Sequence, residues 1–328
     1  MYKWRENTVI FGLRGAEGIA KETAKATGIK FGEIEQKLFA DGEMYINSLT
    51  SVRNKKVYII QSTSNPASDR LIELFLLLDA LKRSSATELI VVFPYYGYAR
   101  QDRKGRKRET IAAKLMANLV TTAGATKAIL IDIHSEQTQA FFECPVDSIS
   151  MMKRLAKHVL SMKIDNPVIV SPDHGGLSRA REFALNINAE VAVIDKRRPN
   201  HNEVSVQHIL GDVKGKNCII VDDMIDTGGT IVAATAKLKE EGAKDVFIVA
   251  THSILSNGAE KKLKDAGISK IITTDSIDST KASDFVTIIP IAPLVSRFIE
   301  LNNKNESILD DDSENETSFI KKIVKKWN

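Results

Sequence analysis

The sequence lacks the features that mark membrane proteins, secreted proteins and thiolate metal sites. No apolar run in its 328 residues is long enough to span a bilayer, and the opening residues MYKWRENTV have no apolar core of the kind that a signal peptide carries. The two cysteines, Cys144 and Cys218, lie far apart and show no metal-ligand spacing. We therefore expect a cytoplasmic protein without membrane association, whose thiols are buried and free in a reducing compartment.

A strong excess of one charge is also lacking. The chain carries 46 Lys and Arg residues against 42 Asp and Glu, and much of the basic excess sits in local clusters such as 100–108 and 321–326. The resulting net charge of +4 is too small to indicate nucleic-acid binding by itself. With 43% apolar and 27% charged residues the composition is that of an ordinary globular protein, and 328 residues suit two domains better than one.

Short β-branched runs alternate with amphipathic stretches along the chain, which is typical of parallel sheets covered by helices. We expect strands at 8–13, 56–62, 88–95, 127–133, 167–171, 190–195, 217–223, 245–251, 270–274 and 285–290. The helical period places Ile111, Leu115 and Leu119 on one apolar face, and Ile231, Ala234 and Leu238 on another. The sequence therefore predicts an α/β fold whose two halves are of the same kind.

The segment FECPVDSISMMKRLAKHVLSMKIDNP combines a proline, a weak helix and a polar turn between two regions rich in strands. It places the domain boundary near residue 149. After Leu301 the chain becomes polar and acidic, with few residues able to anchor it to a core. We expect a first domain at 1–149, a second at 150–302 and a mobile polar tail at 303–328.

The stretch that ends the CIIV strand carries the most specific chemistry. Asp222, Asp223 and Asp226 lead into a Thr-Gly-Gly-Thr turn, 227–230, at the start of a helix. Glycines in such a turn let backbone N–H groups converge on an anion, and the threonine hydroxyls add donors. Carboxylates would repel a phosphate, but they accept hydrogen bonds from sugar hydroxyls or hold Mg²⁺ through water. A phosphorylated pentose satisfies both halves of the motif.

The alternative is an acidic N-cap in a tight turn, with Asp226 or Thr227 capping the helix. Two acidic residues directly after an apolar strand, and a threonine on each side of the glycines, favour the sugar-phosphate site.

A charged loop follows another strand in FPYYGYARQDRKGRKRE. A triphosphate needs such a loop, whereas the alternatives are a solvated basic face or a nucleic-acid patch with interleaved tyrosines. The tyrosines precede the basic residues instead of alternating with them, which favours the triphosphate. The loop presents Arg100, Gln101, Asp102, Arg103 and Lys104.

Four further stretches carry candidate residues. His134 and Asp173 each end a strand and could jointly hold Mg²⁺ with phosphate oxygens, although a lone histidine is more often structural. IDKRRPNHNE places Lys196, Arg197 and Arg198 after a strand, and its alternative is a surface hairpin with basic residues lying along it. FADGE, residues 39–43, is by itself only a turn.

Together these stretches resemble the ribose-phosphate diphosphokinases, which make phosphoribosyl diphosphate. The resemblance covers nearly the whole chain, from FADGE through FPYYGYARQDRK, DIHSEQ, VSPDHGG, DKRRP and VDDMIDTGGT to ATHSILSNGA. Shorter phosphoribosyltransferases share only the 222–230 loop. The resemblance implies two phosphoribosyltransferase-like domains, each a mainly parallel sheet flanked by helices. No Gly-Lys-Thr/Ser P-loop is present, so the phosphates of ATP must be held in another way.

Matching positions imply a role for each candidate residue. The ATP-binding residues would be Phe39, Asp41, Gly42, Glu43, Arg100, Gln101 and Asp102. His134 and Asp173 would bind Mg²⁺, and Lys196 and Arg198 would be catalytic. The ribose 5-phosphate site would comprise Arg198, Asp222, Asp223, Asp226, Thr227, Gly228, Gly229 and Thr230. Family members are homo-oligomers, hexamers built from dimers, in which adenine reaches across a subunit boundary, and the resemblance implies the same here.

Three functions stay open in the order active diphosphokinase, catalytically silent regulatory subunit of the same fold, and nucleic-acid-binding protein. Silent subunits usually lose matching active-site positions, whereas Lys196, Arg198, His134 and Asp222 are in place here. A nucleic-acid-binding protein using RKGRKR would show a steep salt dependence of binding.

Overall fold

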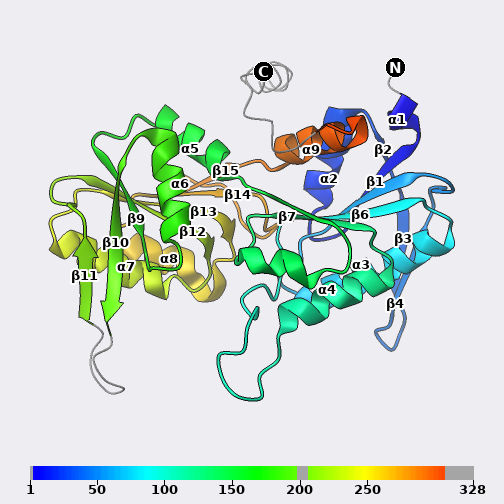
Figure 1. Ribbon diagram of the computed structural model, residues 1–328, viewed down its shortest axis with the longest axis horizontal. Coiled ribbons are helices and arrows are strands. Elements are labelled where there is room, and N and C mark those ends of the chain that lie inside the picture. Colours follow the sequence, from blue (N-terminus) through cyan, green and yellow to red (C-terminus); the bar gives the residue numbers. More distant parts are fainter. Residues whose placement is uncertain (1–2, 198–205, 307–328) are drawn as a thin grey trace. The chain divides into compact units, whose positions relative to one another are not determined.

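The structure is a computed structural model that describes residues 3–197 and 206–306 (Figure 1). It divides into two compact units, the first made of the chain up to Ile149 and again from Pro290, the second of Ser150–Ile289. Each unit is built on a mostly parallel sheet covered by helices, which confirms the predicted α/β fold. Among the described residues, no helix has both the length and the apolarity needed to cross a bilayer.

The first unit contains a six-stranded sheet in the order β2-β1-β5-β6-β7-β8, parallel throughout. The strands are β1 (Thr8–Gly12), β2 (Lys30–Phe31), β5 (Lys56–Ile60), β6 (Glu88–Phe93), β7 (Lys127–Ile131) and β8 (Val146–Ile149). The predicted strands of the first half correspond to β1, β5, β6 and β7. These strands consist of nearly continuous apolar runs because helices cover both faces of the sheet.

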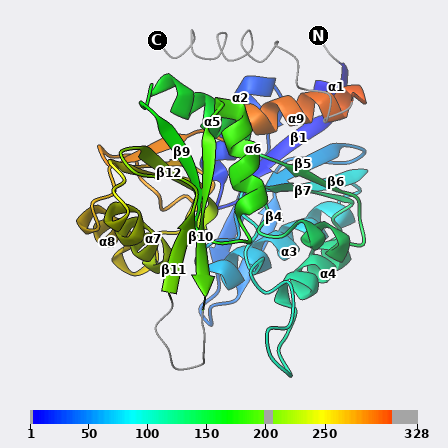
Figure 2. The ribbon, with the colours of Figure 1, turned by 60° about the vertical axis from the view of Figure 1, so that its left-hand side comes forward.

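The helices of the first unit are α1 (Lys3–Glu6), α2 (Glu17–Thr27), α3 (Ala67–Arg83), α4 (Ala112–Ala123), the short η1 (Glu136–Phe141) and α9 (Ala292–Lys304). Figures 1 and 2 show α2 and α9 on one face of the sheet and α3 and α4 on the other. A separate antiparallel hairpin joins β3 (Ile34–Leu38) to β4 (Met44–Ser48).

The buried face of α4 differs from the predicted one. Ala113, Ala117 and Val120 are buried, whereas Leu115 and Leu119 are exposed. The alanines lie at a spacing of four residues and let the helix backbone approach its neighbours closely, so the leucine stripe points away from the core. The other predicted face is confirmed, since Ile231, Ala234 and Leu238 are all buried.

The structure groups α9 with the first unit, although residues up to 302 were predicted to belong to the second domain. The physical reason is the packing of α9 against α2, which buries Phe298 and Ile299. Polar contacts add to it, because the side-chain amides of Asn302 and Asn303 donate to the Tyr58 hydroxyl at 2.6 and 3.1 Å. The part of the predicted tail beyond residue 306 lies outside the described residues.

The second unit contains a seven-stranded sheet in the order β11-β10-β9-β12-β13-β14-β15, in which β11 is antiparallel to its neighbour and the other strands are parallel. Its strands are β9 (Pro167–Ser171), β10 (Glu190–Arg197), β11 (Val206–Leu210), β12 (Asn217–Ile225), β13 (Val246–Ser253), β14 (Lys270–Thr274) and β15 (Val286–Ile289). All six strands predicted for this half are confirmed.

The helices of the second unit are α5 (Met152–Ser161), α6 (Leu177–Ile187), α7 (Gly229–Glu240), the short η2 (Ser256–Gly258) and α8 (Ala259–Asp265). In both ribbon views α5 and α6 lie on one face of the sheet, and α7 and α8 lie on the other. Cys218 is buried on β12 as predicted, Cys144 is half-buried, and both thiols are free. Burial raises the pKa of the Cys218 thiol to about 11.

Each sheet has one point at which the strand order reverses. In the first unit the chain passes from β1 to β2 on one side and later to β5 on the other; in the second it passes from β9 to β10 and later to β12. Ligands of open parallel sheets bind at the carboxyl ends of the strands, at such a switch point. The loops after β1 and β5, and those after β9 and β12, are therefore the places to look for a site.

Candidate functional site

The loop after β12 forms a glycine turn at the start of α7. Gly228 has φ +75° and ψ −4°, a left-handed conformation, and a Cβ there would lie 3.2 Å from the Leu263 side chain, so the position requires glycine. The N-cap residue of α7 is Gly228 and not Asp226 or Thr227, and no side-chain hydrogen bond caps the helix. Backbone N–H groups and the positive end of a twelve-residue helix dipole are thus available to an anion.

An acidic pair precedes this turn. The side chain of Asp222 is 24% exposed, whereas that of Asp223 is 4% exposed. Arg179 on α6 faces both, with its Nη1 3.5 Å from Asp222 Oδ1 and 3.2 Å from Asp223 Oδ1. Burial raises the pKa of Asp222 to about 8, the neighbouring charge of Asp223 adds to the rise, and Arg179 opposes it. Asp222 therefore titrates near neutral pH.

The loop after β9 is a tight turn held by Asp173. Asp173 Oδ1 accepts a hydrogen bond from the Gly176 N–H at 3.0 Å, and Ser171 Oγ donates to the Asp173 carbonyl at 2.7 Å. The residue is exposed, and its second carboxylate oxygen remains for a ligand. Because β9 and β12 are adjacent, the Asp173 turn and the 222–230 loop flank the same switch point.

Lys196 lies at the end of β10, where the backbone pairs with β11 in the register Lys196 to Gln207. Arg198 lies outside the described residues. A contact that the sequence did not predict links this strand end to the Asp173 turn, since His174 Nε2 lies 3.0 Å from Asp195 Oδ1. Residues 174 and 195 are brought together by the parallel pairing of β9 and β10, so no local sequence pattern could have revealed the contact.

In the first unit, the predicted ATP residues 39–43 form the turn of the β3–β4 hairpin. The Phe39 N–H donates to the Glu43 carbonyl at 2.8 Å, and the Glu43 N–H donates to Asp41 Oδ1 at 3.1 Å. Gly42 has φ +93°, a left-handed conformation that favours glycine. The Phe39 ring is 50% exposed and lies edge-on to Tyr45, at 6.0 Å between centroids. The turn therefore presents an aromatic surface and two carboxylates to solvent.

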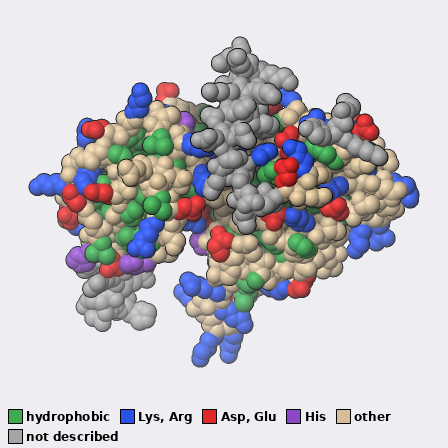
Figure 3. Space-filling view, turned by 45° about the horizontal axis from the view of Figure 1, so that its top comes forward, with side chains coloured by type: hydrophobic (Ala, Val, Ile, Leu, Met, Phe, Trp, Pro, Cys, Tyr) green, Lys and Arg blue, Asp and Glu red, His purple; other side chains and the backbone are tan. Residues whose placement is uncertain are grey.

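The Arg100 loop lies between β6 and α4, and its backbone is fixed at Gln101. The Gln101 N–H donates to the Tyr98 carbonyl at 2.9 Å, and its carbonyl accepts from the Ala113 N–H at 3.2 Å. Gln137 in η1 donates to Asp102 Oδ2 at 2.9 Å, which joins this loop to the segment that follows His134. Figure 3 shows the basic side chains gathered on a projecting loop, whose exposed members are Arg103, Lys104, Arg106, Lys107 and Arg108.

The predicted metal ligands are two single donors in different units. His134 is an exposed imidazole after β7, and Asp173 is an exposed carboxylate after β9. Within residues 3–197 and 206–306, no group of three or more His, Cys, Asp or Glu side chains gathers into a metal cluster. Mg²⁺ commonly keeps several waters and uses one or two carboxylates plus substrate phosphates. Such sparse donors fit a Mg²⁺ that arrives with phosphates better than a resident ion.

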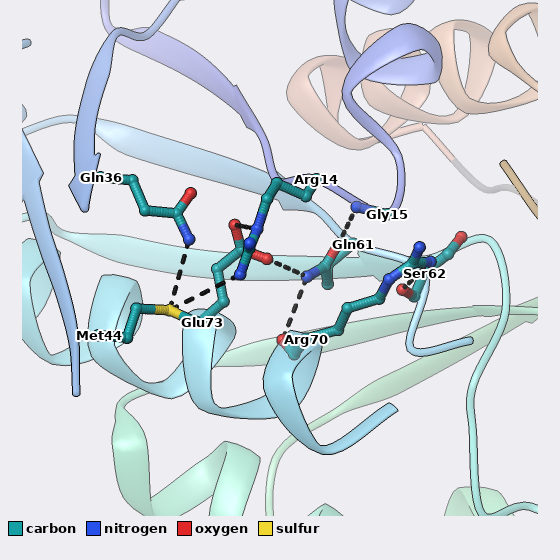
Figure 4. Close-up of polar contacts among 8 residues, drawn as sticks. All are labelled: Arg14, Gly15, Gln36, Met44, Gln61, Ser62, Arg70 and Glu73. Atoms are coloured by element: carbon teal, nitrogen blue, oxygen red, sulfur yellow. Dashed lines mark hydrogen bonds and ion pairs between the residues drawn. The ribbon is translucent and has the colours of Figure 1, made fainter. Parts of the chain in front are cut away.

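The switch point of the first unit is filled by its own side chains (Figure 4). Gln61, just after β5, accepts the Gly15 N–H at 3.0 Å and donates to Glu73 Oε2 at 2.9 Å. Arg14 Nε lies 3.1 Å from Glu73 Oε1, and the Glu73 side chain is fully buried. Buried Arg70 donates to the Ser62 carbonyl at 3.4 Å and to Ser64 Oγ. A Cβ on Gly15 would lie 2.3 Å from the Ser62 carbonyl oxygen, so the loops after β1 and β5 are in direct contact.

Two family models match the chain. One, described as the N-terminal domain of ribose phosphate pyrophosphokinase, matches residues 8–124, and the other, the phosphoribosyl transferase domain, matches residues 147–285. Among curated proteins, the ribose-phosphate pyrophosphokinase of Listeria ivanovii is 45% identical over 302 residues, covering 91% of this chain and 95% of that protein. Ribose-phosphate pyrophosphokinase 2 of Enterococcus faecalis is 44% identical over 303 residues, covering 91% and 94%.

The fold also matches a solved structure. The crystal structure of phosphoribosylpyrophosphate synthetase from Mycobacterium smegmatis superposes with a TM-score of 0.86 at 38% identity. The match covers 91% of this chain and 99% of that one.

Proposed function

The chain belongs to the ribose-phosphate pyrophosphokinase family, the diphosphokinases named above, and from this we infer its reaction. It transfers the diphosphoryl group of ATP to the C1 hydroxyl of ribose 5-phosphate, giving phosphoribosyl diphosphate and AMP. The relatives are named as the enzyme over nearly the whole length of the chain, and none of them supports a silent regulatory subunit.

One observation carries the assignment of the sugar-phosphate site: a glycine turn without a side-chain cap directly follows an acidic strand end at a switch point. We assign the phosphate of ribose 5-phosphate to the backbone and hydroxyls of residues 227–230, with Arg198 as a further contact. Asp222 and Asp226 accept hydrogen bonds from the sugar hydroxyls. We assign Asp223 to the same site, where its side chain is 4% exposed and its N–H donates to Asp222 Oδ1.

The ATP contacts fall on the two exposed loops of the first unit. The half-exposed ring of Phe39 offers a surface on which adenine can stack, and Asp41, Gly42 and Glu43 supply acceptors and backbone for its polar edge. Arg100, Gln101 and Asp102 face the phosphates in this assignment, since a guanidinium matches phosphate geometry. The exposed basic loop then serves the triphosphate and not a nucleic acid.

The reaction needs no protein nucleophile once both substrates are positioned in line. Charge develops on the transferred group, and Lys196 and Arg198 provide the cations that stabilise it. Lys196 is well placed for this role, because β10 ends at the same edge of the sheet as the Asp173 turn and the glycine turn.

Mg²⁺ would neutralise the negative charge of the phosphates when bound. In the second unit Asp173 would contact it through the carboxylate oxygen that does not accept the Gly176 N–H. In the first unit His134, an exposed residue, would contact it through its imidazole. Replacing either residue should raise the Mg²⁺ concentration needed for turnover, and an unchanged requirement would assign that residue to structure.

The exposed apolar stripe of the first unit supports assembly of several copies. Ile72 and Leu76 on α3, and Leu115 and Leu119 on α4, are between 36% and 50% exposed, and the two helices pack side by side. Exposed apolar side chains on neighbouring helices are a feature of interaction surfaces. We propose that a second copy of the chain covers them, in a homo-oligomer that grows from dimers to hexamers.

The direct test is to incubate the protein with ATP, Mg²⁺ and ribose 5-phosphate. AMP and phosphoribosyl diphosphate should appear in equal amounts, and Thr227→Val with Thr230→Val should raise the KM for ribose 5-phosphate. If no AMP forms with the intact protein, the silent regulatory subunit becomes the better assignment.

A further inference from the structure

The guanidinium of Arg179 faces the acidic pair of the second unit from a different element. Arg179 lies on α6, which follows β9, whereas Asp222 and Asp223 lie near the end of β12. A single nitrogen, Nη1, is within 3.5 Å of one oxygen of each carboxylate. The Asp223 N–H also donates to Asp222 Oδ1 at 2.9 Å. The Oδ1 atom of Asp222 is therefore contacted from its own strand and from α6.

The charged groups around Asp222 determine how readily its carboxylate holds a proton. The groups that face its carboxylate are Asp223 on its own strand and Arg179 on α6, while its neighbour on β13, Ala250, carries no charge. Two adjacent carboxylates in a poorly solvated site hold protons more tightly than isolated ones. Arg179 supplies the opposing charge, and a guanidinium stays charged at any pH at which the protein is folded.

We propose that Arg179 is a positioning residue that orients Asp222 and favours its ionised form, so that the carboxylate accepts hydrogen bonds from the hydroxyls of ribose 5-phosphate. A protonated carboxyl group would lose part of its accepting capacity and would no longer make charge-assisted bonds to the sugar. Arg179 acts through Asp222 and need not touch the substrate. This role rests on the assignment of Asp222 to the sugar given above.

The variant that tests it is Arg179→Gln, with Arg181→Gln as the matched control, because Arg181 is an exposed residue two positions along the same helix. The kcat and the KM for ribose 5-phosphate are measured at saturating ATP and Mg²⁺ between about pH 6 and pH 10. Arg179→Gln should raise this KM about tenfold near neutral pH while kcat stays within about twofold.

The pH profile separates this role from a structural one. The pH below which the KM climbs should move upward by about one pH unit in Arg179→Gln, because the opposing charge is gone. Arg181→Gln should keep the wild-type profile, which also removes any contribution from the titration of the substrate phosphate. Arg179→Lys retains the charge and should keep the profile near that of the wild type, with a smaller rise in KM.

Two outcomes would overturn the proposal. One is a KM that rises in Arg179→Gln by the same factor at every pH; the other is a kcat that falls with it. If Arg179→Gln does not fold, Arg179→Lys carries the test, and a profile shifted well above the wild-type one would contradict the role of the charge. Asp222→Asn tests separately whether Asp222 binds the sugar. An unchanged KM in that variant would mean that the sugar does not bind there, whereas a raised KM beside a normal Arg179→Gln would reject the role of Arg179 alone.

Discussion

In the first unit the switch point between β1 and β5, here called the filled crevice, holds Gln61, fully buried Glu73 and Arg14. In the second unit the switch point between β9 and β12, here called the open crevice, holds a glycine turn and the partly exposed Asp222. Both crevices follow from the same reversal of strand order. In the first, the loops touch and the carboxylate is bound by neighbouring side chains. In the second, one carboxylate reaches the surface beside a helix terminus. A switch point thus provides a place for polar groups, and the length and closeness of its loops decide whether they bind each other or a ligand.

Breaking the filled crevice should produce the largest effect on stability. Glu73→Ala removes the acceptor shared by Arg14 and Gln61. The free energy of unfolding should fall by about 3 kcal/mol, the lower end of the cost of breaking a buried pair, since Arg14 is half-exposed. Chemical denaturation measures this. Glu88→Ala, which breaks the surface pair with Lys56, is the control and should cost no more than about 1 kcal/mol. Equal losses in the two variants would show that the network does not stabilise the unit.

Lys196→Ala should lower turnover at the open crevice without affecting the stability of the protein. Loss of one cationic contact to the developing charge costs on the order of a hundredfold in kcat. The KM values and the melting temperature should change little, because the role is confined to the transition state. Lys262→Ala, at an exposed position on α8, should leave kcat unaltered. The double variant with Arg198→Ala should lose less than the product of the single effects if the two residues act as one clamp. A Lys196→Ala variant with near-normal kcat would refute the assignment.

A third variant tests whether the Asp173 turn is held in position by its contact with β10. Asp195→Asn keeps the shape of the side chain but weakens its contact with His174, and so loosens the Asp173 turn against β10. Turnover at limiting Mg²⁺ should fall roughly tenfold, as is usual when the support of a metal ligand is removed. Asp212→Asn, at an exposed pair with Lys216, serves as the control. Wild-type turnover in Asp195→Asn would mean that the two loops are held independently.

The pH dependence of stability should also distinguish the two crevices. The pKa of Asp222 is raised in the folded protein from 3.8 to about 8. The folded state therefore retains a proton that the unfolded state has lost, and the stability contributed by this group declines as the pH rises from about 4 to about 8. Without ligands, Asp222→Asn should become more stable relative to the wild type over this range. Denaturation at several pH values tests the sign, and a wild-type advantage that grows with pH would contradict it.

The smallest effect on stability is expected at the exposed stripe. Leu115→Ser with Leu119→Ser should alter the free energy of unfolding of the monomer by no more than about 0.5 kcal/mol, since the side chains contribute little to the core. The same double variant should shift the protein toward smaller species in sizing experiments. An unchanged assembly would show that another surface joins the copies.

The strands that the sequence predicted are those whose apolar runs are buried on both faces, such as β1 and β12. The strands that it missed are short or mixed in polarity. The β3–β4 hairpin alternates polar and half-buried positions, and β2 has only two residues. Such segments become strands through pairing with a neighbour, which no local pattern records. The buried face of α4 was predicted wrongly for a related reason. The prediction followed the leucines, whereas in the structure the alanines of this helix face the core.

The residues of the candidate site also fall into those that the sequence could predict and those that it could not. Residues 222–230 could be predicted because the carboxylates, the glycines and the strand lie within one stretch of chain. Arg179, Asp195 and Glu73 could not, because each acts through a partner that is distant in sequence. Only the order of strands in the sheet, which brings the loops of neighbouring strands together, indicates these residues.

The return of α9 to the first unit has a consequence for synthesis on the ribosome. The hydroxyl of Tyr58 and the α2 face that α9 covers can be completed only after residues 292–304 have been made. At 5–20 residues per second, translating the second unit leaves the nascent first unit without its last helix for roughly ten to thirty seconds. During that interval the second unit, which is continuous in sequence, can already fold. The chain therefore completes its later unit before its earlier one.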